Sequence, residues 1–404
     1  MAERSILIDV SRLIWRFWRG GMPTGIDRVC YAYVRRFQEH SQAVIHRAGT
    51  YNILTPKHSD LLFDLFDADP TTFRRKFLRL SARAFPASRR RSREPEVLYM
   101  NIGHTGLDEP SLPRWIERNS LRAVYLIHDL IPLLHPEYCR PGEETKHRRR
   151  MENVLTSAHG LIGNSQATID DLAFFAAEHD LPMPPAVAAW IAGSQIPSLV
   201  GRESFDRPHF ITVGTIEGRK NHSLLLHIWK RLVRQYGLKT PLLVIVGQRG
   251  WEAGHSLAML DRAADLKDHV IELGNCDDQT LAGLIAGARA LLMPSFAEGF
   301  GMPVAEAIQL GTPVIASDLP VFHEFAGSIP TYLDPLDGVG WESAIMNFTG
   351  DSLERERQLQ EMQGYRAPDW VSHFDQVQQW LASIGCPVGE TGLSKAEYRW
   401  HDPS

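Results

Sequence analysis

Short apolar runs alternate with longer amphipathic stretches along most of this chain. In the first half, the runs that we expect to be buried strands are Ser5–Val10, Val97–Asn101, Ala123–Ile127 and Gly160–Ile162. In the second half they are His209–Val213, Leu242–Val246, Val270–Leu273, Ala290–Met293, Pro313–Ala316 and Thr331–Leu333. Strands that alternate with helices predict parallel sheets. We therefore expect an α/β protein with two doubly wound, Rossmann-like domains that face a cleft.

The stretches between these runs show the helical period of apolar residues. We expect helices at Ile26–Glu39, Gln166–Glu178, Ser223–Tyr236 and 369–384, and a further one that opens at Pro303 and closes at Gly311. The stretch after Val10, up to Gly25, is expected to be a loop, as is Asp318–Glu324. We divide the chain into residues 1–200, 201–368 and a C-terminal part, 369–404, whose helix packs back toward the first domain and is followed by a tail.

The stretch from Pro294 to Ser317 organises the second half. A loop with Glu298, Gly299 and Gly301 follows a buried strand and leads into the helix at Pro303. Backbone N–H groups at such a helix start bind anions. Glu306 lies eight residues after Glu298, so both carboxylates can face one crevice and bind hydroxyls. Phosphate and hydroxyl groups together suggest a sugar nucleotide.

Other residues with useful chemistry follow predicted strands. Arg219 and Lys220 come after the strand at 209–213 and could neutralise a diphosphate, although surface charge is the simpler alternative. The loop that contains Arg249 could hold a base. Gly25 lies in a glycine-rich stretch before a helix and either helps to cradle phosphate or forms a plain turn. His128 follows a buried strand, where parallel sheets bind ligands, or is a structural histidine.

Composition and charge exclude several classes. The 404 residues are 44% hydrophobic with a net charge of −5, which argues against a nucleic-acid-binding protein. Four widely spaced cysteines indicate a reducing compartment. We see no signal peptide and no membrane-spanning run, so we expect a cytoplasmic protein, soluble or peripheral on the inner face of the membrane.

A basic segment stands out in this acidic chain. Phe73, Phe77, Leu80 and Ala84 recur at helical spacing among cations that extend to Arg93. Such a segment is typical of docking on anionic lipid through apolar burial and charge, with residues 73–93 as the contact, or of a solvated helix. The nearby triplet Asp67-Ala68-Asp69 has the DxD pattern of metal-dependent transferases, but no strand precedes it, and chance explains it better.

Several motifs together resemble the retaining glycosyltransferases with the GT-B fold, family 4 (glycosyl transferases group 1), in their mannosyltransferase-like branch. The matching stretches in the second half are the Glu298–Glu306 EX7E pattern, 311–317, 213–221 and 275–281. Those in the first half are 24–28 and 127–132. One departure is Thr215, where many relatives have an arginine, so Arg219 and Lys220 must provide the positive charge.

The resemblance implies a role for each matching residue. Glu306 would hold the ribose hydroxyls and Glu298 the sugar hydroxyls, while His128 would face the reacting sugar. Arg219 and Lys220 would neutralise the diphosphate. The backbone contacts to sugar and phosphates would come from Gly25, Phe300, Gly301 and Met302. These cations and dipoles would replace a divalent metal, so neither a metal nor another cofactor is expected.

The activity implied is transfer of a hexose, with retention of configuration, from a nucleotide-diphosphate sugar to a saccharide or lipid-linked acceptor in surface polysaccharide or glycolipid assembly. GDP-mannose or a related GDP-sugar is favoured, and UDP- or dTDP-sugars are the alternative. A GT-B epimerase or phosphorylase lacks support, since no pyridoxal-phosphate lysine motif stands out. A non-catalytic scaffold with this fold is opposed by the intact Glu298, Glu306 and Lys220.

Overall fold

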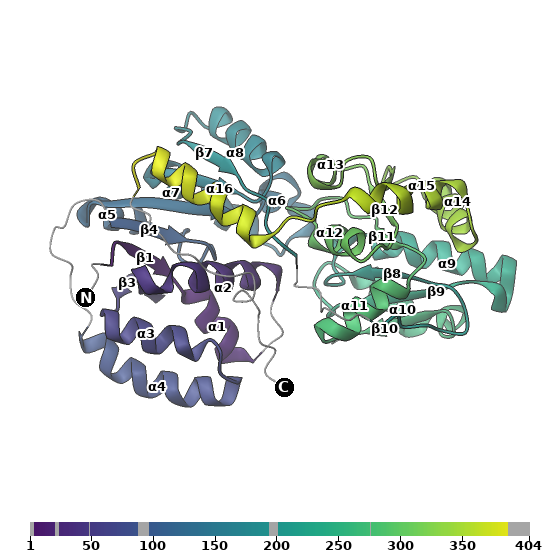
Figure 1. Cartoon of the computed structure of the whole chain (residues 1–404), viewed down its shortest axis with the longest axis horizontal. Coiled ribbons are helices and arrows are strands. Elements are labelled where there is room, and N and C mark those ends of the chain that lie inside the picture. Colours follow the sequence, from purple (N-terminus) through teal and green to yellow (C-terminus); the bar gives the residue numbers. More distant parts are fainter. Residues whose placement is uncertain are drawn as a thin grey trace. The chain divides into compact units, whose positions relative to one another are not determined.

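A computed structural model describes residues 4–20, 24–47, 49–87, 97–193, 201–274 and 276–386 (Figure 1). The chain divides into two compact units, which are described separately. Unit 1 contains Met1–Leu130, Thr145–Ile191 and Asp369–Ser404, and unit 2 contains Ile131–Glu144 and Ala192–Pro368. The sequence prediction kept residues 131–144 in the first domain, whereas here they group with unit 2. Parts of the predicted segments fall outside the described residues, namely 21–23, 88–96, 194–200, 275 and 387–404.

Unit 1 is built on a seven-stranded sheet in the order β3-β2-β1-β4-β5-β6-β7. Neighbouring strands are parallel except for the antiparallel pair β2 and β3. All residues of β1 and β4 are buried, as expected for strands covered on both faces. The strands are β1 (Ile6–Asp9), β2 (Ser41–Arg47), β3 (Thr50–Ile53), β4 (Val97–Asn101), β5 (Leu121–Ile127), β6 (Gly160–Gly163) and β7 (Ala186–Ala188).

The helices of unit 1 include one that the sequence prediction missed. They are α1 (Ser11–Arg19), α2 (Gly25–Phe37), α3 (Pro56–Leu65), α4 (Pro70–Ala87), α5 (Leu112–Arg118), α7 (Glu143–Ser157), α8 (Gln166–Glu178) and α16 (Trp370–Ser383). The stretch after Val10 was expected to be a loop, but Ser11–Arg19 is helical. Leu13 and Phe17, four residues apart, are buried on one face of α1, and this packing offsets the lack of an N-cap hydrogen bond.

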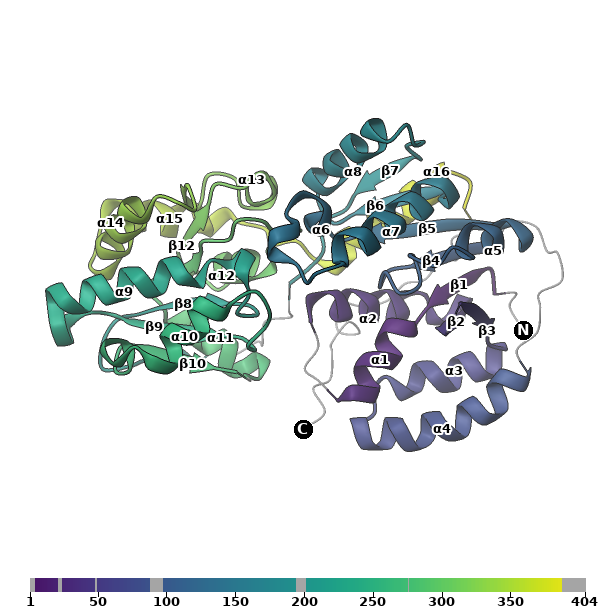
Figure 2. The same ribbon diagram turned by 180° about the vertical axis from the view of Figure 1, so that it is seen from behind.

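Helix α4 buries the apolar face that the sequence suggested for membrane contact. Phe73 and Ala84 are almost fully buried, and Phe73 stacks against Phe77 at 5.4 Å between ring centroids. Figures 1 and 2 show α3 and α4 side by side. The apolar face is therefore part of the unit 1 core and does not contribute the apolar burial that lipid docking was expected to use. The basic side chains of the opposite face are exposed.

Helix α16, from the C-terminal end of the described chain, belongs to unit 1. Its Phe374 packs edge-on against Tyr33 of α2 at 5.0 Å between ring centroids. The hydroxyl of Tyr33 also hydrogen-bonds Nε2 of the buried His373, 2.8 Å away. Residues more than 300 positions apart in sequence thus share one core.

Unit 2 contains a six-stranded parallel sheet in the order β10-β9-β8-β11-β12-β13. This order, in which the chain runs outward from β8 and then returns to its other side, is that of the dinucleotide-binding fold. The strands are β8 (His209–Val213), β9 (Leu242–Val246), β10 (Val270–Leu273), β11 (Leu291–Met293), β12 (Val314–Ser317) and β13 (Thr331–Leu333). Each strand expected from the sequence is present.

The helices of unit 2 again include one that was expected to be a loop. They are α6 (Ile131–Leu134), α9 (His222–Tyr236), α10 (Gly254–Arg262), α11 (Asp278–Gly287), α12 (Met302–Gln309), α13 (Pro320–Ala326), α14 (Gly338–Thr349) and α15 (Leu353–Glu361). Within 318–324 the chain turns helical at Pro320, in the first helical position, where a missing N–H group does no harm. Phe322 and Phe325 are buried on the inner face of α13.

An apolar cluster of unit 2 joins the sheet to helices α9, α10 and α14. Trp229 of α9 and Trp341 of α14 are fully buried there, together with Phe210 of β8. Trp229 also donates its indole N–H to the carbonyl of Pro241, 2.9 Å away. This cluster fixes the start of α9, just after the loop with Arg219 and Lys220.

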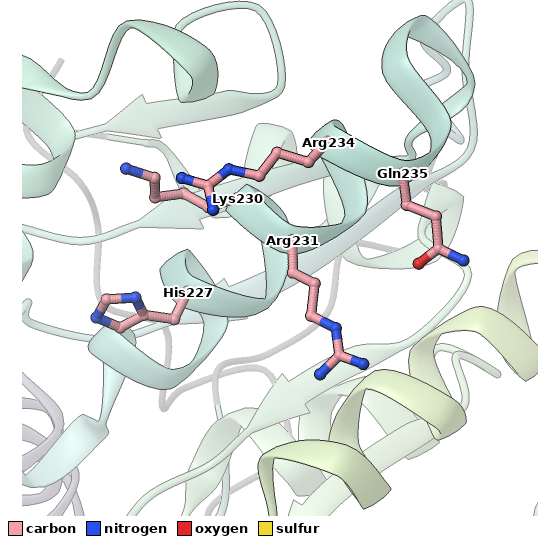
Figure 3. Close-up of a pocket in the computed structure, with 5 residues that line it drawn as sticks. All are labelled: His227, Lys230, Arg231, Arg234 and Gln235. Atoms are coloured by element: carbon pink, nitrogen blue, oxygen red, sulfur yellow. The ribbon is translucent and has the colours of Figure 1, made fainter.

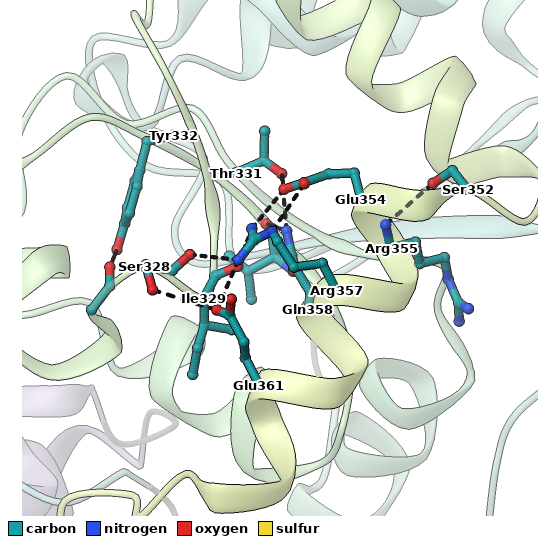
Figure 4. Close-up of polar contacts among 12 residues, drawn as sticks. Ser328, Ile329, Thr331, Tyr332, Ser352, Glu354, Arg355, Arg357, Gln358 and Glu361 are labelled. Atoms are coloured by element: carbon teal, nitrogen blue, oxygen red, sulfur yellow. Dashed lines mark hydrogen bonds and ion pairs between the residues drawn. The ribbon is translucent and has the colours of Figure 1, made fainter.

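A polar network holds β12 and β13 against α15 (Figure 4). The buried amide of Gln358 accepts from Val314 N at 2.8 Å and donates to Val314 O at 3.0 Å. Arg357 donates to the carbonyls of Ser328 and Ile329, at 3.0 and 3.1 Å. The bonds of Gln358 satisfy buried backbone groups at the start of β12 that would otherwise have no partner there.

In the described part of the chain, no helix combines the length and the apolar character needed to cross a membrane.

Candidate functional site

The loops after β8 and β11 meet at the point where the strand order of the unit 2 sheet reverses. In folds of this type, ligands bind beside the carboxyl ends of the strands at such a point. The N–H of Phe296, in the second loop, donates to the carbonyl of Arg219, in the first, at 2.8 Å. This bond joins backbone segments that are 77 residues apart in sequence. It also brings Arg219, Lys220 and Glu298 together.

Glycines allow the first loop to lie against its neighbours. Gly214 has φ +139°, and a Cβ atom there would lie 3.1 Å from Cε of Lys220. A Cβ atom on Gly247 would lie 1.9 Å from the carbonyl oxygen of Gly214. Because only glycine fits either position, the backbone and the Lys220 side chain can pack closely.

Glu298 forms ion pairs with both Arg219 and Lys220. Its Oε2 lies 2.8 Å from Nη1 of Arg219, and its Oε1 lies 2.6 Å from Nζ of Lys220. Ser295 Oγ also donates to Oε1, at 2.7 Å. Nε of Arg219 lies 2.6 Å from Oε1 of Glu217, so two cations and two carboxylates form a cluster with no net charge. The resemblance implied that Glu298 binds sugar hydroxyls; in the structure, its two oxygens bind Arg219, Lys220 and Ser295.

The ion pairs control the ionisation of Glu298. Burial raises the pKa of its carboxyl, but Arg219 and Lys220 lower it more, and the resulting pKa is about 2. Burial in turn lowers the pKa of the Lys220 ammonium, an effect that Glu298 opposes. Only 5% of the Glu298 side chain is exposed. Glu298 is therefore a carboxylate at neutral pH and has no proton to donate as a general acid.

Glu306 lies on α12, one turn after the loop that contains Glu298, and is 7% exposed. A Cβ atom on Gly193 would lie 2.8 Å from Cγ of Glu306, so the backbone of the 192–193 segment passes close to this carboxylate. Gly301 precedes the helix with φ +92°, and a Cβ atom there would lie 2.3 Å from Phe322. Phe300 stacks on Phe325 in the core. The expected contacts of the backbone N–H groups of Phe300, Gly301 and Met302 with the donor stay a prediction.

Arg249 was expected near the base of the nucleotide. Its Nε lies 2.7 Å from Oε1 of Glu272, and its Nη2 lies 2.7 Å from Oδ1 of Asp261. The side chain is 43% exposed. In this structure the guanidinium is thus part of an exposed ion-pair group that links β10 and α10. The expected contact of Arg249 with the base stays a prediction.

His128 follows β5 in unit 1 and is 4% exposed. Its Nε2 is 2.8 Å from the carbonyl oxygen of Ile102, which can only accept, so Nε2 carries the proton and Nδ1 carries the lone pair. Burial lowers its pKa to about 4, so the ring is neutral at physiological pH. The His104 ring lies 5.1 Å from it, and burial also lowers the pKa of His104. A neutral imidazole can accept a hydrogen bond from a sugar hydroxyl.

The start of α2, with Gly25 as its first residue, contains a cluster that the sequence prediction missed. The buried Asp27 accepts from the N–H of Thr24 at 2.8 Å. Nε of Arg12 and Nε of Arg16 each lie 2.7 Å from an oxygen of this carboxylate. The signal in the sequence is the spacing of four between the arginines, which places both on one face of α1 once α1 is known to be helical. The predicted approach of Gly25 and His128 to the unit 2 loops stays a prediction.

Two further groups of charged residues lie elsewhere. The aspartates of the DxD triplet have structural roles: Asp67 pairs with Arg35 at 3.0 Å, and Asp69 accepts from backbone N–H groups at the start of α4. On α9, a hollow of about 580 Å³ is lined by His227, Lys230, Arg231, Arg234 and Gln235 (Figure 3). The sequence prediction did not single out this basic helix face.

The two doubly wound units define the class of the protein, which is a chain with the GT-B fold of glycosyltransferases. In comparisons with solved structures, Anabaena HepE in complex with UDP matches with a TM-score of 0.62 at 16% identity, over 94% of this chain and 99% of that one. The sucrose-phosphate synthase of Thermosynechococcus elongatus matches with a TM-score of 0.61 at 16% identity. At these identities, the likeness concerns the fold alone.

Sequence comparison identifies the domain in unit 2. Residues 201–328 match the model of the family "Glycosyl transferases group 1", so this part of the chain is a group 1 glycosyltransferase domain. The serotype-specific mannosyltransferase WbdA of Escherichia coli is 31% identical over 220 residues, which are 50% of this chain and 27% of WbdA. The O-antigen chain mannosyltransferase B of E. coli is 28% identical over 256 residues, 61% of this chain and 65% of that relative. The match thus spans about a quarter of the length of WbdA and about two thirds of the length of mannosyltransferase B.

Proposed function

We propose that this protein is a retaining, metal-independent hexosyltransferase that uses a nucleotide-diphosphate sugar. The observation that carries the proposal is the meeting of Arg219, Lys220 and Glu298 at the switch point of the unit 2 sheet. The group 1 domain and the relatives named mannosyltransferases support this activity.

Departure of the nucleotide diphosphate builds negative charge on a phosphate oxygen. Arg219 and Lys220 would transfer part of their hydrogen bonding from Glu298 to the diphosphate, and the N–H groups at the start of α12 would add to this stabilisation. The oxygens that Glu298 then exposes would accept from the sugar hydroxyls. On this proposal, the ion pairs of Glu298 with Arg219 and Lys220 are exchanged for contacts with the donor when the donor binds.

The proposal assigns no protein nucleophile. The acceptor hydroxyl would attack on the face that the nucleotide leaves, and a phosphate oxygen would take its proton. Glu306 would hold the ribose, and neutral His128 would accept a hydrogen bond from the reacting sugar through Nδ1. Near neutral pH, Glu298 is a carboxylate and His128 is a neutral ring, which are the forms that these hydrogen bonds require.

We propose GDP-mannose or a related GDP-sugar as donor, and a saccharide or lipid-linked acceptor in surface polysaccharide assembly at the cytoplasmic side of the membrane. The two E. coli mannosyltransferases, one of which is named for the O-antigen chain, support this choice. A UDP-sugar is the second candidate, because HepE is described in complex with UDP and with UDP-glucose.

The test begins with the donor. Melting temperatures of the full chain would be compared with GDP, UDP, dTDP and ADP, because a ligand that binds only the folded state raises its melting temperature. We expect GDP to give the largest shift. Transfer of labelled sugar with and without EDTA, followed by NMR of the new glycosidic bond, then tests metal independence and retention. If no nucleotide raises the melting temperature and no sugar is transferred, the proposed function is wrong.

A further inference from the structure

The segment Pro136–Arg140 contacts the loops that follow β8, β9 and β11 of unit 2. It lies in Ile131–Glu144, which groups with unit 2 although the chain on either side belongs to unit 1. The η2 turn, Pro136–Tyr138, forms its first part. Figure 2 shows α6, which directly precedes this segment.

Tyr138 packs against two of these loops. Its ring stacks on Phe296, in the loop after β11, with 5.2 Å between ring centroids and planes 6° apart. Its Cδ1 lies 3.4 Å from the position that a Cβ atom on Gly218, in the loop after β8, would occupy. A tyrosine ring therefore covers the point where the two loops meet.

Arg140 reaches the third loop. Its guanidinium lies over the ring of Trp251, 4.6 Å from the centroid. Such a cation–π contact holds the side chains of two exposed residues in place. Trp251 follows Gly250, whose N–H donates to the carbonyl of Ile216 at 3.0 Å, so the loops after β8 and β9 are themselves bonded.

The stacked ring has a direct link to the charged cluster. Phe296 is the residue whose N–H donates to the carbonyl of Arg219, and Glu298 lies two residues further on. If the Phe296 ring loses its stacking partner, this backbone bond loses support. The distances between the Glu298 carboxylate and the cations of Arg219 and Lys220 are then no longer fixed.

We propose that Tyr138 is a positioning residue for the loops that contain Arg219, Lys220 and Glu298. It acts through Phe296 and Gly218 and does not contact the reacting atoms. The inference rests on the proposed function only for its consequence, which is weaker binding of the donor nucleotide when the loops are released.

The primary test uses the full chain without ligand. Hydrogen exchange would be measured at the Phe296 amide, the donor of the bond between the loops, in the wild type, Tyr138→Ala and Tyr138→Phe. A stacked aromatic pair stabilises by an amount that corresponds to about threefold to tenfold in an equilibrium constant, so we expect Tyr138→Ala to speed exchange by about that factor. Tyr138→Phe keeps the ring and should exchange like the wild type.

Tyr51→Ala is the matched control. Tyr51 stacks on Trp115 in unit 1 at 4.5 Å between ring centroids, so the variant loses a stacked tyrosine far along the chain from these loops. It should leave exchange at Phe296 unchanged. If Tyr138→Ala does not fold, Phe296→Leu removes the same stack from the other side and should release exchange at its own amide and at Lys220.

Calorimetry with GDP and UDP then separates the two proposals. We expect weaker nucleotide binding in Tyr138→Ala and native binding in Tyr138→Phe, at similar melting temperatures. Unchanged exchange at Phe296 in Tyr138→Ala and in Phe296→Leu would overturn the positioning role, whatever the nucleotide results. If exchange is faster in Tyr138→Ala but the wild type binds neither GDP nor UDP, the positioning role would be supported and a GDP- or UDP-sugar donor would be ruled out.

Discussion

Nζ of Lys220 lies 2.6 Å from Oε1 of Glu298, and less than a tenth of either side chain is exposed. A buried charge without a partner is costly, so each residue keeps the other ionised within the fold. The pair also means that the cations proposed for the diphosphate already have an internal anion. A ligand must compete with this anion, and several measurable consequences follow from the competition.

Glu298→Gln should destabilise unit 2 and change its preference for ligands. Removing one partner of a buried ion pair lowers the free energy of unfolding by about 3–5 kcal/mol. Because Arg219 is partly exposed, we expect a loss of about 2–4 kcal/mol here. Because the cations lose their competitor, the variant should bind a free nucleoside diphosphate more tightly while transferring sugar more slowly. Urea unfolding and calorimetry measure both effects. Ser295→Ala, which keeps every charge, is the control, and equal stability of Glu298→Gln and wild type would contradict this account.

The same carboxylate predicts a dependence of stability on pH. Its pKa falls from 4.5 to about 2 on folding, so its contribution is complete above about pH 4.5 and is lost as the pH falls toward 2. The full contribution is roughly 3 kcal/mol. Urea unfolding at pH 6 and pH 3 should show a larger loss for the wild type than for Glu298→Gln. Parallel losses in both proteins would exclude Glu298 as the source.

Asp9 predicts a pH effect of the opposite sign in unit 1. Burial raises the pKa of its carboxyl to about 7, although hydrogen bonds from Ser11 and Tyr99 oppose the shift. The folded state therefore retains a proton that the unfolded chain loses above about pH 4, and stability falls as the pH rises from 4 to 7. Asp9→Asn should be more stable than the wild type at pH 8, by about 1–3 kcal/mol, and nearly equal at pH 4. Urea unfolding of both proteins at the two pH values tests this; an Asp9→Asn variant less stable at pH 8 would refute it.

Glu306 is expected to bind the ribose of the donor. Glu306→Ala should weaken nucleotide binding by about 1–3 kcal/mol, since it removes a charged hydrogen-bond acceptor. Gly193→Ala offers an indirect test, because its methyl group would lie 2.8 Å from Cγ of Glu306 and displace the side chain. Gly201→Ala, with no atom within 4 Å of the new methyl group, is the matched control. Calorimetry should rank affinities as wild type and Gly201→Ala above Gly193→Ala, and unchanged affinity in Glu306→Ala would remove the ribose assignment.

The basic face of α4 is proposed to contact anionic lipid, and its buried apolar face makes this contact mainly electrostatic. Five cations and no acidic residue lie within its 18 residues. Changing Arg75, Lys76 and Arg79 to Gln should weaken binding to phosphatidylglycerol vesicles by about 1 kcal/mol per cation, and binding of the wild type should fall steeply with salt. The control is a triple variant that removes the same charge from α9, with Lys230, Arg231 and Arg234 each changed to Gln. Equal loss of co-sedimentation in both triple variants would show an effect of net charge alone.

The sequence predicted the central strands because apolar runs buried on both faces leave a strong signal. It missed three strands of unit 1, β2, β3 and β7, and most residues of β3 and β7 are not fully buried. It missed α1, whose N-cap residue Val10 offers no side-chain hydrogen bond and whose buried residues Leu13 and Phe17 are separated by Ile14, Trp15 and Arg16. It missed α13 because Pro320, in the first helical position, resembles a loop residue in sequence. Both helices are stabilised by packing on elements far along or outside their own segment, α1 on α4 and β2, and α13 on α12. The local sequence does not contain this packing.

The candidate site, like the fold, could be predicted from the sequence only in part. Arg219, Lys220 and Glu298 were found because motifs mark them, but their mutual ion pairs were not, since 78 residues separate Glu298 from Lys220. Arg249 was expected near a base, whereas Glu272 and Asp261 engage it at the surface. Tyr138 gave no signal, because its importance depends on Phe296, which lies far along the chain. Only the three-dimensional structure shows which charges and rings are neighbours.

The single backbone bond from Phe296 to the carbonyl of Arg219 has a consequence for natural variation. The bond forms only if the number of residues from the end of β8 to Arg219, and from the end of β11 to Phe296, is kept. Insertions or deletions in either loop would separate the donor from its acceptor, even if every charged side chain were kept. Among relatives that retain this bond, the lengths of the two loops should therefore change together or not at all, while the helices that follow them are free to vary.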